Sequence, residues 1–172
     1  MINKKTEKAF NDQLNAETYS AYLYWSMSAA LEAMNLAGFA NWMRVQAQEE
    51  MVHAMKFYTH IIERTGKVAL KALAAPPTEW DSVTAIFNDA YKHEQKVTSL
   101  INGLADLAIK EKDHAANIFL QWFVNEQIEE EKSVDIVLKK LEMIAERPEG
   151  LLMLDKEMGT RTFTPPAESE KT

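Results

Sequence analysis

Hydrophobic side chains recur along most of the chain at alternating spacings of three and four residues, which is the pattern of amphipathic helices. Proline, which breaks helices, is confined to positions 76, 77, 148, 165 and 166. The hydrophobic repeat and the positions of proline together predict four long helices and a short fifth one, over residues 5–34, 39–65, 82–109, 113–146 and 149–158. The chain is therefore predicted to be all-α.

The ends of these predicted helices carry two kinds of signal. Asp81 or Ser82 can cap the third helix and Asp113 the fourth, because their side-chain oxygens can accept the free N–H groups of a first turn. Four of the five glycines lie where a helical pattern stops, as glycines at helix C-termini do: Gly38, Gly66, Gly150 and Gly159.

The connections predict how the helices are arranged. About four residues join the first helix to the second and the third to the fourth, so each pair should form an antiparallel hairpin. The 16 residues between the second and third helices, 66–81, can span roughly 50 Å when extended. The 27-residue second helix is only about 40 Å long. We therefore expect a four-helix bundle with one long crossover and a short fifth C-terminal helix.

Each predicted long helix carries a glutamate on the face that should be buried. The inward positions are otherwise mostly apolar, and each glutamate lies near the middle of its helix. Near-midpoint positions meet at one level whichever way a helix runs. The side chains expected to converge there are Glu17, Glu50, His53, Glu94, Gln127 and Glu130.

Four carboxylates in a dry core require compensation, because even one isolated buried ion is very unfavourable. No Lys or Arg occupies the middle of the four inward faces, so either several acids are neutral or metal cations lie among them. The spacing Glu50-x-x-His53 favours metal, since it places an oxygen and an imidazole on one helix face. Carboxylates with one histidine suit iron or manganese better than zinc, and Glu50 could bridge two ions.

Length and composition limit the number of domains, the kinds of partner and the location of the protein. The 172 residues fit one domain, placed at 1–158 and followed by an extended or loose tail, 159–172. With 19 basic and 26 acidic residues, the net charge of −7 disfavours nucleic acid and favours cations. The absence of cysteine excludes disulfides and thiolate metal sites. No apolar run has the ~20 residues of a membrane span, and the N-terminus is unlike a signal segment, so we expect a cytoplasmic protein without a membrane partner.

Residues 5–158 resemble the non-haem ferritins of bacteria and archaea. The resemblance is carried by motifs on all four long helices: Asn15-Ala16-Glu17 with Tyr19-Ser20-Ala21-Tyr22, Gln48-Glu49-Glu50-Met51-Val52-His53-Ala54, Glu94, and Phe119-Leu120-Gln121-Trp122-Phe123-Val124-Asn125-Glu126-Gln127 with Glu129-Glu130-Glu131-Lys132. It implies the ferritin-like bundle that a single long crossover also suggests.

The resemblance implies a role for each polar residue. Two irons would share Glu50, and their ligand sets would be Glu17, Glu50 and His53 for the first and Glu50, Glu94 and Glu130 for the second, with Gln127 lining the pair. A weaker third site would use Glu49, Glu126, Glu129 and Glu130. Tyr24 would be a redox-active neighbour of the dinuclear centre.

The function implied is iron storage with ferroxidase activity. Fe²⁺ would be oxidised by O₂ or H₂O₂ at the dinuclear centre and stored as a ferric mineral in a homo-oligomeric shell of 24 subunits. Haem is not expected. Bacterioferritins have a second Glu-x-x-His on the fourth helix, whereas the matching positions here are Gln127 and Glu130. The DNA-binding mini-ferritins are also disfavoured, because the chain has a fifth helix and no basic tail.

Two other classes of function remain open from the residues alone. A non-storage di-metal oxidase or peroxidase would use the same centre in a small oligomer without forming a mineral. A purely structural bundle would bind no metal and keep its inward acids neutral.

Overall fold

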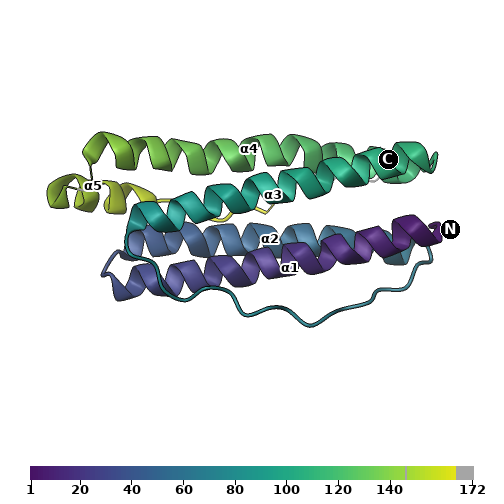
Figure 1. Ribbon diagram of the computed structural model, residues 1–172, viewed down its shortest axis with the longest axis horizontal. Coiled ribbons are helices and arrows are strands. Elements are labelled where there is room, and N and C mark those ends of the chain that lie inside the picture. The colour runs from purple at the N-terminus through teal and green to yellow at the C-terminus, as the bar shows by residue number, and fades with distance from the viewer. Residues whose placement is uncertain (146, 166–172) are drawn as a thin grey trace.

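The computed structural model describes residues 1–145 and 147–165, and all regular secondary structure within them is helical. The helices are α1 (Lys4–Ala33), α2 (Ala37–Glu63), α3 (Val83–Lys110), α4 (His114–Ile144) and α5 (Pro148–Met158). The long helices form a bundle, with α5 at one end (Figure 1). The all-α prediction is confirmed. Predicted and observed ends agree within two residues, except that the predicted end of the fourth helix, residue 146, lies outside the described residues.

The predicted caps of α3 and α4 are present. The Ser82 hydroxyl, and not Asp81, accepts the N–H of Ala85 at 3.1 Å. Asp113 Oδ1 accepts the N–H of Ala116 at 3.1 Å and also pairs with Arg64 at 2.8 Å. Asp113 therefore both starts α4 and ties it to the end of α2.

The expectation that glycines end the helices is only half correct. Gly66 and Gly159 do follow α2 and α5, but Gly38 and Gly150 lie inside the first turns of these helices. All five glycines are described and none has a positive φ; within the described chain the left-handed residues at helix ends are Asn35, Thr65, Lys112 and Ala145. Gly38 instead permits close packing, since a Cβ there would lie 1.7 Å from the backbone oxygen of Asp155 in α5.

The chain between α2 and α3 is the predicted long crossover, which runs along the bundle so that α3 starts parallel to α2 (Figure 1). Two asparagines of α1 bind the crossover, because each side-chain amide donates to a backbone carbonyl and accepts a backbone N–H. Asn11 donates to the carbonyl of Lys67 at 2.9 Å and accepts the N–H of Ala69 at 2.6 Å. Asn15 donates to the carbonyl of Ala69 at 3.1 Å and accepts the N–H of Lys71 at 2.7 Å. The crossover is thereby fixed along α1.

The apolar core is divided into two parts. One buried cluster includes Tyr24, Met43, Phe87 and Val134, and the other includes Phe10, Phe57, Ile101 and Leu120. The glutamates predicted to face inward lie along the helices between these clusters. The two apolar parts provide the burial that stabilises the bundle, and they keep solvent from the polar layer between them.

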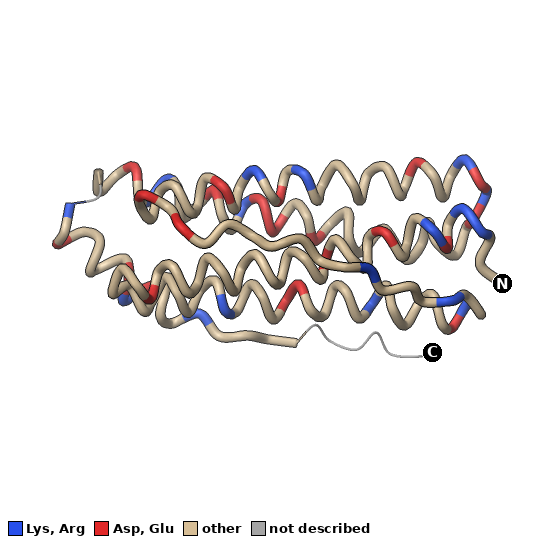
Figure 2. The backbone as a smooth tube through the Cα atoms, turned by 60° about the horizontal axis from the view of Figure 1, so that its bottom comes forward, with Lys and Arg blue, Asp and Glu red and all other residues tan. Residues whose placement is uncertain are grey.

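Helix α5 closes one end of the bundle. Leu154 and Met158 belong to the apolar cluster that contains Tyr24. Asp155 Oδ1 accepts the N–H of Phe39, in the first turn of α2, at 2.9 Å. Leu152 and Met153 stay exposed, so α5 keeps an apolar surface that its own chain does not cover. Residues 159–165 then run back along the bundle without regular structure (Figure 2). The rest of the predicted tail, 166–172, lies outside the described residues. Within the described chain, every helix is too short or too polar to cross a lipid bilayer.

Substituting Gly38 by Ala should destabilise the protein, although alanine normally favours a helix. The new methyl group would overlap the backbone of Asp155 and separate α5 from α2. Gly103→Ala is the matched control, because a Cβ there meets nothing within 4 Å, and it should stabilise α3 by about 0.5–1 kcal/mol. Thermal unfolding checks both changes. A Gly38→Ala protein as stable as the parent would contradict the observed packing of α5.

Candidate metal centre

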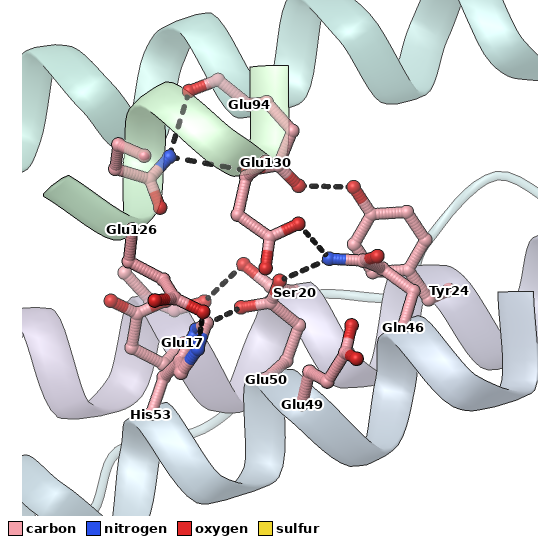
Figure 3. Close-up of polar contacts among 12 residues, drawn as sticks. Glu17, Ser20, Tyr24, Gln46, Glu49, Glu50, His53, Glu94, Glu126 and Glu130 are labelled. Carbon is pink, nitrogen blue, oxygen red and sulfur yellow. Dashed lines mark hydrogen bonds and ion pairs between the residues drawn. The ribbon is translucent and has the colours of Figure 1, made fainter. Parts of the chain in front are cut away.

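The four long helices bring six polar side chains together in the middle of the bundle (Figure 3). Helix α1 contributes one, α2 two, α3 one and α4 two, and none is more than 4% exposed: Glu17, Glu50, His53, Glu94, Gln127 and Glu130. Each lies on the inward stripe of its helix, where the neighbouring turns are apolar. The regular helical repeat is therefore what aims all six at one level.

On the side of α1 and α2, three ligand groups converge. Glu50 and His53 share one face of α2, with Oε2 3.4 Å from Nδ1, and Glu17 faces them from α1. One potential ligand atom from each of the three lies within 4.8 Å of the others. Glu17 Oε1 accepts a hydrogen bond from Gln13 at 2.9 Å, whereas Glu17 Oε2 is buried without a partner. Buried oxygens are rarely left unpaired, so this one indicates a missing proton or cation.

On the side of α3 and α4, amide and hydroxyl groups hold the carboxylates. Glu94 accepts hydrogen bonds from the Tyr24 hydroxyl and, at 3.2 Å, from Gln127 Nε2. Glu130 accepts one at 2.5 Å from Gln46 Nε2, and this nitrogen also donates to Glu50 at 3.2 Å. Gln46 therefore connects carboxylates of α2 and α4.

The residues expected to form the third site are only partly assembled. Glu126 approaches the polar cluster, with its Oε1 3.8 Å from His53 Nε2, and it can form a second ligand trio with His53 and Glu130. Glu49 is instead paired with Arg161 at 2.5 Å. Glu129 is exposed and belongs to neither trio found among the described residues.

The electrostatics of the centre without cations follow from burial. Burial, reinforced by the nearby charge of Glu50, raises the pKa of both Glu17 and Glu94 to about 8. The pKa of Glu130 is also raised well above its usual range, by burial and by Glu94. Burial opposes the charges of Glu50 and His53 too, but their attraction wins, so the pKa of Glu50 is lowered and that of His53 raised. At neutral pH the cation-free centre is thus one buried ion pair among protonated glutamates.

These residues fit divalent cations that prefer oxygen ligands. Several carboxylates and a single imidazole match the ligand preference of Fe²⁺ or Mn²⁺. A cation beside Glu17 would supply the partner that its free oxygen lacks, and it would displace the protons that burial now imposes.

Three aromatic side chains surround the polar cluster. The Tyr24 hydroxyl contacts Glu94 directly, and burial together with that carboxylate raises the tyrosine pKa well above its usual range. Trp122 packs edge-on against His53, with ring centroids 5.4 Å apart. His93 is hydrogen-bonded to Ser20 at 2.8 Å and lies edge-on to Tyr24.

Two further residues that contact the polar cluster were not predicted from the sequence. Gln46 occupies an inward position one turn before Glu50, so its spacing already placed it beside the cluster, although we expected no role for it. Arg161 reaches the cluster from the segment after α5. That segment has no helical repeat from which the direction of a side chain could be predicted.

Replacing Glu17 by Gln should stabilise the cation-free protein at pH 8. A carboxyl group whose folded pKa is raised contributes stability that is complete below its unfolded pKa and is lost as the pH rises toward the folded value. For Glu17 this loss falls between about pH 4.5 and pH 8, whereas an amide cannot ionise. We expect Glu17→Gln to gain roughly 1–3 kcal/mol at pH 8 and little at pH 5.

Thermal unfolding in the presence of a chelator, at both pH values, measures this effect. The exposed Glu79→Gln is the control and should change nothing. Addition of Zn²⁺ should reverse the order at pH 8, because the parent gains more from the cation than the amide variant. A variant that is no more stable than the parent at pH 8 would show that Glu17 is ionised without a cation.

Comparisons with known proteins agree with this geometry. The family model described as a ferritin-like domain matches residues 7–144. A bacterial non-haem ferritin of Bacteroides fragilis (strain 638R) is 37% identical over 161 residues, covering 94% of this chain and all of the relative. One of Staphylococcus aureus (strain MRSA252) is 36% identical over 163 residues, covering 95% and 98%.

A solved structure extends the agreement to the fold. A closed form of the Archaeoglobus fulgidus ferritin, engineered by site-directed mutagenesis, is 50% identical and superposes with a TM-score of 0.94, covering 95% of this chain and all of that one. The fold prediction is thereby confirmed over nearly the whole molecule. The chain belongs to the ferritin family.

Proposed function

We propose that this protein is an iron-storage ferritin that oxidises Fe²⁺ at the buried polar layer of each subunit. Membership of the ferritin family supports iron storage and iron oxidation in general. The single observation that carries the assignment of the site is the unpartnered Oε2 of Glu17, in a layer of four carboxylates that face one another in the core. Protons or cations can complete such a layer, and the trio of Glu17, Glu50 and His53 fits a cation.

The ligand sets follow from which side chains face each other. Glu17, Glu50 and His53, which form one ligand trio, hold the first Fe²⁺. In this proposal Glu50 is shared with the second Fe²⁺. Glu94 and Glu130 complete the second position, and Gln127 holds Glu94 by a hydrogen bond. The Tyr24 and Gln127 contacts leave lone pairs on Glu94 for a cation, since each carboxylate oxygen has two.

Pairing two ions suits the oxidation chemistry. Each Fe²⁺ gives up one electron, so a pair can reduce O₂ by two electrons to the level of H₂O₂, or H₂O₂ to water, with protons completing the products. No one-electron oxygen radical is released in such a step. The carboxylates stabilise the additional positive charge that forms on oxidation, because they lie in a water-excluded layer.

Storage requires an enclosed compartment, which one bundle of this size does not form. We infer that residues 1–158 act as the ferritin-like di-iron domain and assemble into a closed homo-oligomer of 24 subunits. The exposed Leu152 and Met153 of α5 support assembly, since large apolar side chains commonly mark contacts between subunits. The alternative, a non-storage di-metal oxidase, would use the same centre in a smaller oligomer.

The amount of iron retained distinguishes these functions. Purified protein is fractionated by size, loaded with Fe²⁺ under anaerobic conditions and then exposed to air. We expect a shell-sized particle that keeps far more iron per subunit than the two or three ions its sites can bind. Retention that stops at two or three ions, on a small oligomer, would indicate the non-storage enzyme. A protein that keeps no iron would support the structural bundle.

Substituting Glu50 by Ala should abolish rapid Fe²⁺ oxidation. This carboxylate contacts His53 and Gln46 and faces both proposed iron positions, so its loss removes the bridge and leaves His53 without its counter-ion. We expect the rate, followed by ferric absorbance, to fall at least about tenfold, as for the loss of one good ligand or its support. Glu79→Ala is the exposed control. Oxidation at the parental rate would show that the centre is elsewhere.

A further inference from the structure

The segment that follows α5 carries a cation to the edge of the metal centre. Residues 159–165 lie along the bundle (Figure 2), and Asn41 of α2 donates a hydrogen bond to the carbonyl oxygen of Arg161 at 2.9 Å. The Arg161 guanidinium stacks over the Trp42 ring, 4.3 Å from its centroid. Both the backbone and the side chain of this residue are therefore held on α2.

The guanidinium makes two polar contacts that point toward the centre. Its Nη2 donates to Glu49 Oε2 at 2.5 Å, and its Nη1 donates to Gln46 Oε1 at 3.0 Å. The side chains of Arg161 and Glu49 are only 22% and 23% exposed, so solvent screens this pair less than an ordinary surface ion pair. Trp42, Gln46 and Glu49 follow one stripe of α2, and the guanidinium lies along it.

The contact with Gln46 determines which way its amide faces. Arginine can only donate hydrogen bonds, so it holds the amide oxygen toward itself. The amide nitrogen must then face the other way, where it donates to Glu50 and Glu130. The amide is thus held from both sides, and loss of the guanidinium would leave its oxygen without this donor and its nitrogen less firmly placed against Glu50 and Glu130. Arg161 thus acts on two proposed iron ligands without touching either.

We propose that Arg161 is an internal counter-ion and positioning residue of the metal centre, which occupies Glu49 in place of a third cation and orients Glu50 and Glu130 through Gln46. This inference rests on the proposed function, in which Glu49 belongs to a third cation site. A cation and the Arg161 guanidinium compete for the Glu49 carboxylate, and their like charges repel each other when both lie beside it. A third ion therefore binds Glu49 only as Arg161 withdraws, so occupancy of this site is coupled to the position of residues 159–165.

Arg161→Ala should change two cation affinities in opposite directions. Removing the competitor should tighten the third site about tenfold, the effect of losing one charge-assisted hydrogen bond. Releasing Gln46 should weaken the dinuclear pair about fivefold, the effect of losing one ordinary hydrogen bond. Calorimetric titration of the cation-free full-length protein with Zn²⁺, which undergoes no oxidation, measures both affinities in one experiment.

Two further variants separate this effect from a general loss of positive charge. Arg44 of α2 pairs with Glu32 of α1 at 2.6 Å, so Arg44→Ala removes an equal charge from another ion pair on α2 and should leave both Zn²⁺ affinities near the parental values. In a Glu49→Gln background the contested carboxylate is absent. Arg161→Ala should then no longer tighten a third site but should still weaken the pair.

The possible results are distinct. Opposite changes that occur in Arg161→Ala and are absent from Arg44→Ala support the proposal. Changes of one sign at all sites would overturn it, because they would indicate a general electrostatic or structural effect. Two tight sites in the parent, with no third site gained in Arg161→Ala, would overturn it and leave the proposed function standing. A parent that binds no Zn²⁺ would instead contradict the proposed function itself.

Discussion

The free energy of placing four carboxylates in a water-excluded layer is the constraint on which the rest of this structure depends. An isolated buried carboxylate is destabilising by several kcal/mol, so the cation-free protein must reduce the charge that it buries. It does so by protonation of Glu17 and Glu94, whose pKa values lie at about 8, and by pairing Glu50 with His53. The layer therefore requires protons or cations inside an otherwise apolar bundle.

A helical bundle is well suited to maintain this requirement. Helix interiors satisfy their own backbone groups, so in mid-bundle few backbone donors are free to pair with a carboxylate. The carboxylates must therefore be paired by side chains. Three side-chain amides each donate to one or two carboxylate oxygens: Gln13, Gln46 and Gln127. The apolar clusters on both sides exclude water as a substitute. A folded state that cannot complete its own hydrogen bonding remains ready to bind ions.

Helical periodicity explains what the sequence could and could not predict. Glu17, Glu50, His53 and Glu94 are buried as the periodicity predicts, because each follows the repeat of one long helix, and mid-helix positions meet at any helix direction. Gly38 was misread because a glycine near a helix end is a local signal, whereas its cause is the close approach of α5 from the other end of the chain. The resemblance also groups Glu126, Glu129 and Glu130 in one site, yet burial separates them, since the helix face that they share reaches from core to solvent.

The centre is also asymmetric, and the asymmetry follows from residue identity. On α2 the residue three positions after Glu50 is His53, whereas on α4 the corresponding inward pair is Gln127 and Glu130. In the proposed assignment the first ion has a nitrogen ligand, from His53, and the second ion has only oxygen ligands. Both oxygens of Glu94 accept hydrogen bonds from neutral donors, Tyr24 and Gln127. Imidazole binds first-row divalent metals more firmly than carboxylate oxygens do, so the second position should be the more labile. Glu126 forms a trio with His53 and Glu130, one ligand from each proposed ion, so this partly buried carboxylate adjoins both positions.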